Sequence, residues 1–134
     1  MNNEKLVLHI NAHKGWRTAL PDAKMINRRG LFYASSYKEA EFYGRPIDIP
    51  FTINIKRPLF GDEIHVMQTL GLPLPNQDIS IKERFAMDAK MKRLAIAKGY
   101  DSVALFTTKA YQTYMKTGTI PRSIELQVFI NKRG

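Results

Sequence analysis

The chain has 134 residues, a length that favours a single domain able to bury a core without a metal or disulfide to hold it. Cysteine is absent, which excludes a thiol nucleophile and a disulfide framework. With 21 Lys and Arg against 12 Asp and Glu, the net charge is +9, and an anionic partner is plausible.

The beginning of the chain lacks the basic start and long apolar run of a signal peptide, and no stretch approaches transmembrane length. We therefore expect one cytoplasmic, monomeric domain over residues 1–134, with no membrane partner. The basic residues are dispersed along the sequence, and no nucleic-acid-binding motif accompanies them. This dispersion is typical of a solvated surface rather than a groove for DNA.

The apolar run over residues 5–10 predicts a buried strand that carries His9 near its end. A lone histidine in such a strand is more often a core residue than a catalytic one. The stretch that follows is less regular and is interrupted by Pro21. Its arginines suit a pyrophosphate contact and an ordinary exposed surface equally well: Arg17, Arg28 and Arg29.

Residues 30–44 say most about function. A glycine precedes a strand over residues 31–34, and Ser36, three residues before Glu39, predicts the capping box of a short helix that Gly44 ends. This order brings the ring of Phe32 or Tyr33 near that of Tyr43, and two such rings can hold a flat ligand between them. The structural alternative is that one of Phe32 and Tyr33 packs in the core.

Residues 47–55 alternate enough to predict a strand, which has Pro50 at an edge or bulge and ends around Pro58. Residues 61–78 contain several glycines and prolines, and we expect a long loop with a helical turn around residues 64–70. His65 lies in that loop without a second metal ligand or a nucleophile at a suitable spacing, so we place it on the surface.

The clearest helix covers residues 81–98. Ser80 and Glu83 form its capping box, and Gly99 ends it. Two apolar stripes predict burial on more than one side of this helix, with Met87 and Met91 as core residues.

The last part of the chain carries the candidate acid. Residues 99–106 predict a turn and a buried strand, residues 109–122 a polar loop rich in turns, and residues 123–130 a core strand. Glu125 lies at the start of that final strand, where a carboxylate costs free energy unless it is solvated or paired. An exposed strand end or a salt bridge to Arg122 would be the structural explanation.

The glycine, aromatic strand and short helix of residues 30–44 resemble a segment of the diphtheria-toxin-like and poly(ADP-ribose)-polymerase-like ADP-ribosyltransferases. The helix, Gly-Tyr-Asp and strand of residues 81–106 and the final strand with its glutamate extend the resemblance over most of the chain. The resemblance implies an α+β fold of split, packed antiparallel sheets with flanking helices. It also implies NAD as the substrate, with no metal.

The same resemblance implies roles for individual residues. Glu125 would be the catalytic acid, and His9 would hydrogen-bond a ribose hydroxyl of NAD. The main chain of Ile10, at a position where the family usually has glycine, would grip the nicotinamide amide. The nicotinamide would lie between the rings of Tyr43 and Phe32. At the position of Phe32 the family has a tyrosine, whereas in this chain the tyrosine comes one residue later, at Tyr33.

The implied function is mono-ADP-ribosyl transfer to a macromolecule, a protein in preference to nucleic acid, by a toxin-like or phage-encoded modifier of host factors. Ser123 argues against an arginine acceptor, because arginine-directed relatives carry Glu or Gln there. The loop before Glu125 is where the family often recognises its target, so Tyr111, Tyr114 and Arg122 are candidate contacts. An ordinary exposed loop is the equal alternative.

Two other functions stay open at this point. A binding module on the same fold without turnover is indicated by Ile10 and Phe32, where the chain departs from the family. Modification of DNA or RNA is indicated by the net charge of +9.

Overall fold

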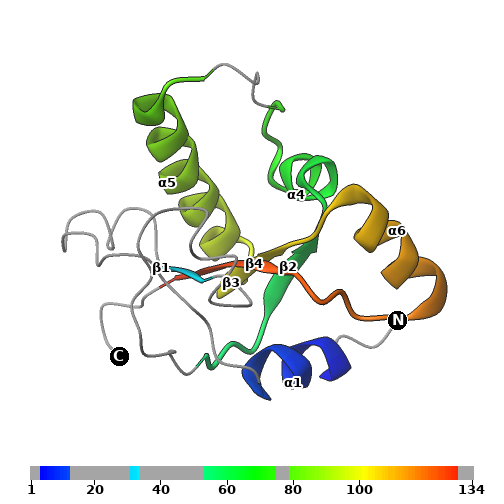
Figure 1. Cartoon of the computed structure of the whole chain (residues 1–134). Helices are drawn as coiled ribbons and strands as arrows, with labels where there is room; N and C mark the ends of the chain where they lie inside the picture. Colours follow the sequence, from blue (N-terminus) through cyan, green and yellow to red (C-terminus); the bar gives the residue numbers. More distant parts are fainter. Residues whose placement is uncertain (1–3, 13–30, 34–52, 75–78, 130–134) are drawn as a thin grey trace.

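The computed structural model describes residues 4–12, 31–33, 53–74 and 79–129. Within these ranges the chain forms an α+β fold in which a four-stranded mixed sheet has helices on both faces (Figure 1). The strand order is β1-β4-β3-β2. The β2 and β3 strands run parallel, while β4 is antiparallel to both of its neighbours. No helix in this part of the chain is long and apolar enough to cross a membrane.

The first helix, α1 (Glu4–Ala12), replaces the strand predicted over residues 5–10, so that prediction is wrong. Leu6 and Ile10, four residues apart, are buried together on one side of α1, whereas Leu8 is 69% exposed. A strand would have placed all three on one face, because its side chains alternate with a period of two. The apolar run is therefore helical, with its core contacts spaced at one turn.

The aromatic strand is present as β1 (Leu31–Tyr33), paired antiparallel with β4 (Glu125–Val128). The helix predicted after Ser36, together with Tyr43, lies outside the described residues.

The strand predicted over residues 47–55 begins outside the described residues, and its described part does not form a strand. Residues 53–55 are not in a strand, and β2 covers Pro58–Gly61 instead. Asp101 limits the start of β2, because its carboxylate accepts hydrogen bonds from the main-chain N–H groups of Lys56 and Arg57 at 2.7 and 3.0 Å. These donors cannot also serve a strand ladder. Pro58, which has no N–H, then takes the first position of β2.

Two helices occupy stretches predicted as loops. The expected turn around residues 64–70 is a complete helix, α4 (Glu63–Leu70), capped by Asp62 and ended by Gly71. The loop predicted over residues 109–122 is wrong in its first half, where α6 (Thr108–Thr117) forms. The Thr107 hydroxyl accepts from the Ala110 N–H at the start of α6.

The long helix and the strand after it are confirmed. Helix α5 (Ile81–Ala97) begins at Ser80, whose hydroxyl accepts from the Glu83 N–H at 3.1 Å, and β3 (Ser102–Leu105) follows it. One expectation for α5 is wrong: Phe85 and Ile96 are 36% and 49% exposed, so the helix is buried on one side only. Met91 is buried in the core, and Met87 packs beside it.

Each face of the sheet has its own core. Helices α4 and α5 cover one face, where Leu59 and Val103 pack against Val66 and Ala95. Helices α1 and α6 lie on the other, where Leu6 of α1 and Tyr114 of α6 pack against Ala104 and Leu126. Because side chains alternate along a strand, a residue next to Leu126 in β4 belongs to the face under α4 and α5.

Candidate functional site

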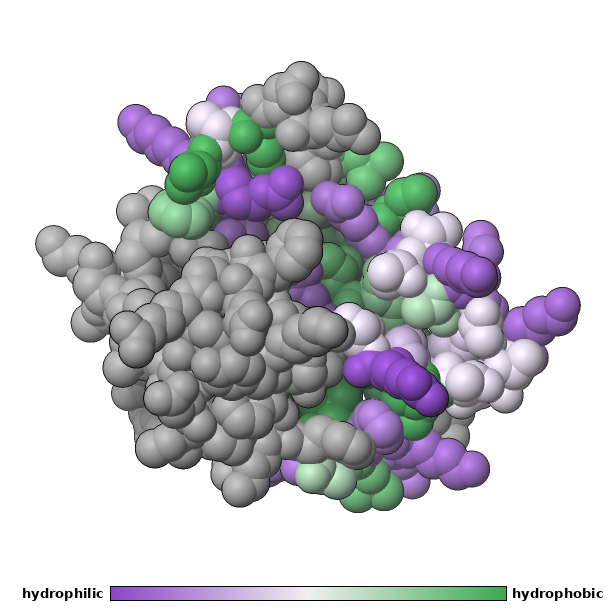
Figure 2. All heavy atoms as spheres, viewed as in Figure 1, coloured by the Kyte–Doolittle hydropathy of each residue, from purple (hydrophilic) through white to green (hydrophobic). Residues whose placement is uncertain are grey.

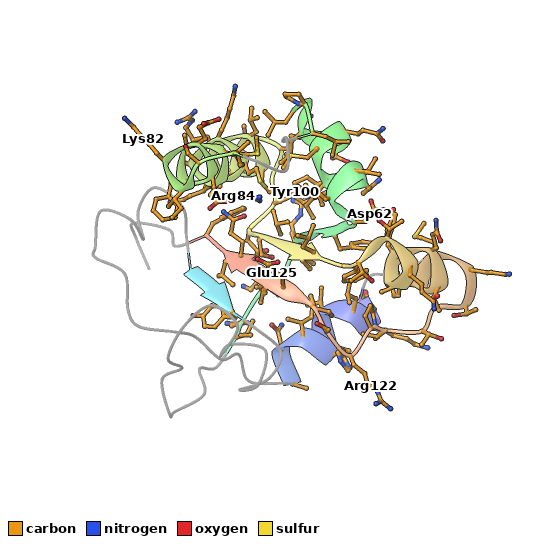
Figure 3. The ribbon with its side chains drawn as sticks, turned by 45° about the horizontal axis from the view of Figure 1, so that its top comes forward. Asp62, Lys82, Arg84, Tyr100, Arg122 and Glu125 are labelled. Atoms are coloured by element: carbon orange, nitrogen blue, oxygen red, sulfur yellow. The ribbon has the colours of Figure 1, made fainter. Side chains whose placement is uncertain are left out.

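Glu125 is the first residue of β4 and lies opposite Leu105 of β3. Its neighbour Leu126 packs in the core beneath α1 and α6, so Glu125 belongs to the sheet face covered by α4 and α5. In Figure 3 Glu125 lies on β4 below α5, and Arg84 extends from that helix on the same side of the sheet. The final strand thus places the candidate acid near the first half of α5, which contains Arg84 and Asp88.

The surroundings of Glu125 raise its pKa above the ordinary value of 4.5. Desolvation is the largest cause, followed by the nearby carboxylate of Asp88 on α5. Arg84 opposes the shift by lowering the pKa, and Glu63 on α4 adds to it. The side chain is still exposed on one side. Glu125 is therefore a carboxyl group that is partly screened from water by protein and open to a ligand from the solvent side.

A layer of buried polar side chains lies between α5 and the sheet, made of Asp88, Lys92 and Gln127, which we call the polar layer. They are 9%, 9% and 4% exposed. The Gln127 side-chain amide donates to the main-chain oxygen of Asp88 at 3.4 Å, which links β4 to α5. Gln127 lies two residues after Glu125 on the same face of the strand. The polar layer therefore fixes the part of β4 that carries Glu125.

The polar layer was not predicted from the sequence, although the sequence contains a signal for it. Arg84, Asp88 and Lys92 recur every four residues, so they share one side of a helix. Asp88 and Lys92 are buried. Charged residues at helical spacing usually lie on a solvated surface, so their spacing alone does not indicate that Asp88 and Lys92 are buried.

The aromatic strand β1 is the neighbour of β4. Phe32 lies opposite Gln127 in the register, and Tyr33 lies opposite Leu126. Tyr33 is 8% exposed and belongs to the core beneath α1 and α6, which confirms the alternative that one of these two aromatic residues is structural. The structure thus brings the backbone of the aromatic strand beside the strand that opens with Glu125.

His9 and Ile10 are not brought to Glu125. Both lie on α1, and Ile10 is 6% exposed in the core that also contains Leu126. The helix α1 therefore lies on the face of the sheet opposite to Glu125 and the polar layer. In place of a strand whose main chain is available to a ligand, the sequence forms a helix that packs through Leu6 and Ile10.

The predicted target contacts have different surroundings. Tyr114 is 2% exposed, and its ring packs edge-on against Phe60 and Phe106 with centroid separations of 5.5 and 5.7 Å. Its prediction as a target contact is wrong, because a core side chain offers no surface to a partner. Arg122 is exposed, and Figure 3 shows it pointing away from the protein.

Tyr111 is half-buried and stacks at a tilt of 32° on His65, with ring centroids 5.2 Å apart. His65, which the sequence places on the surface, is half-buried and covered on one side by this ring. The pKa values of Tyr111 and Tyr114 are both raised by desolvation, and the carboxylate of Asp62 adds to the shift at Tyr111. Both phenols stay neutral at physiological pH.

Among the described residues, no group of three His, Cys, Asp or Glu side chains is arranged to hold a metal ion. Tyr43 and the arginines considered for a pyrophosphate contact, Arg17, Arg28 and Arg29, lie outside the described residues.

No family model, curated protein or solved structure matches this chain.

Proposed function

We propose that the protein is an NAD-dependent mono-ADP-ribosyltransferase that modifies a macromolecule, a protein in preference to nucleic acid, with Glu125 as its catalytic carboxylate. One observation carries the proposal. Glu125 opens β4, next to the aromatic strand β1, and its carboxyl group is partly desolvated while remaining open on one side. A glutamate in this position suits the family that residues 30–44 and 123–130 resemble.

The proposed reaction needs one negative charge at a defined place. As the bond between the ribose anomeric carbon and the nicotinamide nitrogen breaks, nicotinamide leaves with the electron pair and positive charge develops on the ribose. The Glu125 carboxylate stabilises that charge, and partial exclusion of water strengthens the interaction. The acceptor nucleophile then bonds to the anomeric carbon and loses its proton, which Glu125 is placed to take.

The pKa shift at Glu125 has a consequence for this chemistry. Only the ionised carboxylate stabilises the developing positive charge, and the surroundings of Glu125 favour the protonated form. The rate of transfer should therefore rise with pH through the raised pKa of this group and then level off.

The proposal extends to parts of the chain beyond the described residues. It includes the split-sheet architecture of the family and a nicotinamide pocket in which Tyr43 stacks with the ring contributed by β1. It assigns no role to His9, since α1 lies on the opposite face of the sheet.

Transfer from NAD labelled in its adenylate part to the components of a cell lysate tests this function. The decisive variant is Glu125→Gln, which removes the charge and keeps the shape. Glu83→Gln is the matched control, because Glu83 is exposed at the start of α5 and glutamine also serves in a capping box. We expect label on protein with the wild type and the control, and none with Glu125→Gln. Label that nucleases remove would instead identify nucleic acid as the acceptor.

The position of α1 favours a second candidate, a binding module without turnover, because the histidine expected to orient the ribose belongs to a helix that packs on the opposite face of the sheet from Glu125. Under this alternative neither the wild type nor Glu125→Gln transfers label to any acceptor. Equal labelling by the two proteins would contradict the catalytic role of Glu125.

A further inference from the structure

We propose that the solvent-facing side of α5 is a binding surface for the phosphate backbone of a nucleic acid. Its contacts are Lys82, Lys90 and Arg93, which we call the basic row. The inference is independent of ADP-ribosyl transfer, since it concerns a binding surface on the outside of α5 and not the chemistry at Glu125.

The helix gathers charges that look dispersed in the sequence. Lys82, Lys90 and Arg93 are separated by eight and three residues, so a period of 3.6 residues per turn places them on the same side of α5. All three are exposed, and Figure 3 shows Lys82 pointing away from the protein. The row extends over roughly 16 Å of helix. The buried side of α5 is formed by other residues: Asp88, Ala89, Met91, Lys92 and Ala95.

The electrostatics of α5 are one-sided. The helix contains five basic and two acidic residues, which gives it a net charge of +3. Of the two acids, Asp88 is buried in the polar layer, and Glu83 is tied to Ser80 at the first turn. Glu83 is therefore the one acid of α5 near the basic row, and the three cations leave the solvent-facing side net positive. Since α5 packs on α4 and β3, the charges are also held on a rigid support.

The side chains between the charges indicate which polyanion fits. Ala86 and Ala97 share the side of the basic row, and the exposed Phe85 and Ile96 lie at its edge, one helical turn from Lys82 and Arg93. The row itself therefore has small side chains between its cations. A flat row of cations on a fixed spacing suits a polymer of repeated phosphates, which binds by releasing counterions and without a hydrophobic pocket.

A membrane surface fits less well. An interfacial helix inserts a continuous apolar stripe beside its basic residues. On α5 the exposed Ile81 and Phe85 lie at the start of the helix and Ile96 at its end, and Ala89 and Lys92 between them are buried, so the exposed apolar side chains are not continuous. In the visible part of this region, Figure 2 shows hydrophilic and hydrophobic side chains next to one another.

The test is binding of fluorescein-labelled, random-sequence DNA and RNA of about 30 nucleotides, followed by anisotropy between roughly 50 and 200 mM salt. The variant removes the basic row as Lys82→Gln, Lys90→Gln and Arg93→Gln together. The matched control, Lys56→Gln, Lys109→Gln and Lys116→Gln, removes the same charge from exposed positions outside α5. Circular dichroism verifies that both variants are folded.

We expect the wild type to bind with steep salt dependence. The basic-row variant should lose affinity by about tenfold or more, and its slope of log K against log salt should become flatter by about 3. The control should retain most of the binding. Should the triple variant fail to fold, each single substitution is expected to flatten the slope by about 1.

An equal loss in the basic-row variant and the control would overturn the proposal, because net charge rather than the α5 surface would then be responsible. Salt-independent binding, or none, by the wild type would also overturn it. Vesicles of phosphatidylserine and phosphatidylcholine serve as the competing probe. If they bind the wild type and the nucleic acids do not, the partner is a membrane and the proposal is wrong.

Discussion

Asn11 forms hydrogen bonds with both main-chain polar groups of Ile55. Its side-chain nitrogen donates to the Ile55 oxygen at 2.8 Å, and its side-chain oxygen accepts from the Ile55 N–H at 2.8 Å. An asparagine on α1 thus takes the place of a neighbouring strand for the segment before β2. This pair explains how residues 53–55 stay in the core without belonging to the sheet.

The first prediction concerns this pair. Asn11→Ala leaves the N–H and C=O of Ile55 unpaired in a part-buried site, so it should lower the free energy of unfolding by about 1–3 kcal/mol. Asn11→Asp keeps one acceptor but turns a carboxylate oxygen toward the Ile55 carbonyl, and it should cost at least as much at neutral pH. Urea denaturation measures both. Leu8→Ala, at a 69% exposed position on the same helix, is the control and should change stability by less than about 0.5 kcal/mol. Wild-type stability in Asn11→Ala would show that the pair is unimportant.

The second prediction separates the two tyrosines of α6. Tyr114→Ala empties a site in the core and should destabilise the fold by about 3–5 kcal/mol. Tyr111→Ala removes a half-buried ring that contacts His65 and should cost about 1–2 kcal/mol. Thermal and denaturant unfolding of both variants measure the difference. If the two substitutions cost the same small amount, Tyr114 is not the core residue described above.

A third prediction concerns Gly61, which has φ of 153° and ends β2. A Cβ at this position would lie 2.7 Å from the His65 side chain, which is itself stacked on Tyr111. Gly61→Ala should therefore cost about 2–3 kcal/mol. At Gly71, with φ of 71° and no atom within 4 Å of a new Cβ, alanine should cost only about 1 kcal/mol.

A double-mutant cycle gives the control for Gly61. The cost of Gly61→Ala should be smaller in a His65→Ala background, since the 2.7 Å contact with the imidazole ring is gone and only the backbone strain and the 3.1 Å contact with the Cβ of residue 65 are left. The same cost in both backgrounds would contradict the proposed contact.

The fourth prediction follows from the raised pKa of Glu125. The folded protein holds the proton more tightly than the unfolded chain, whose glutamate has the ordinary pKa of 4.5. Protonated Glu125 therefore contributes to the free energy of unfolding in full below pH 4.5, and this contribution is lost as the pH rises through the folded-state pKa. Glu125→Gln cannot ionise, so it should gain stability relative to the wild type as the pH rises from 4.5 through the folded-state pKa.

Melting temperatures over this pH range measure the effect. In a protein that keeps Glu125, Arg84→Gln should enlarge the pH dependence of the melting temperature, because Arg84 lowers the pKa of Glu125. A difference between wild type and Glu125→Gln that does not vary with pH would show that burial does not perturb this carboxyl group.

The sequence predicted those elements whose boundaries are encoded locally. Ser80 and Glu83 form a capping box, and α5 begins there. A short apolar run that opens with a charged residue predicted β4, including the place of Glu125 at its start. In each case a few neighbouring residues decide the outcome, and distant contacts do not override it.

Elements decided by distant partners were predicted wrongly. The apolar run at the start suits a strand and a helix equally well, and only burial of Leu6 and Ile10 against the sheet selects the helix α1. The strand β2 starts only at Pro58 because Asp101, more than forty residues away, takes the two main-chain donors before it. For α6 a local signal did exist, since Thr107 begins it and Gly118 ends it, but its polar composition concealed the pattern.

Glu125, the central residue of the candidate site, was predictable from the sequence, whereas the residues around it were not. A glutamate that opens an apolar strand can be found by reading the sequence. That Asp88 and Arg84 approach it from α5 depends on how the helix crosses the sheet, which no local pattern specifies.

The central claim is that the Glu125 carboxylate supports cleavage of NAD, and release of labelled nicotinamide by the purified protein tests it most directly. We expect release by the wild type and by Glu83→Gln, and a loss of roughly 100-fold or more in Glu125→Gln, since charge stabilisation at the ribose is removed. Release by Glu125→Gln at the wild-type rate would contradict the claim, as would the absence of release from the wild type.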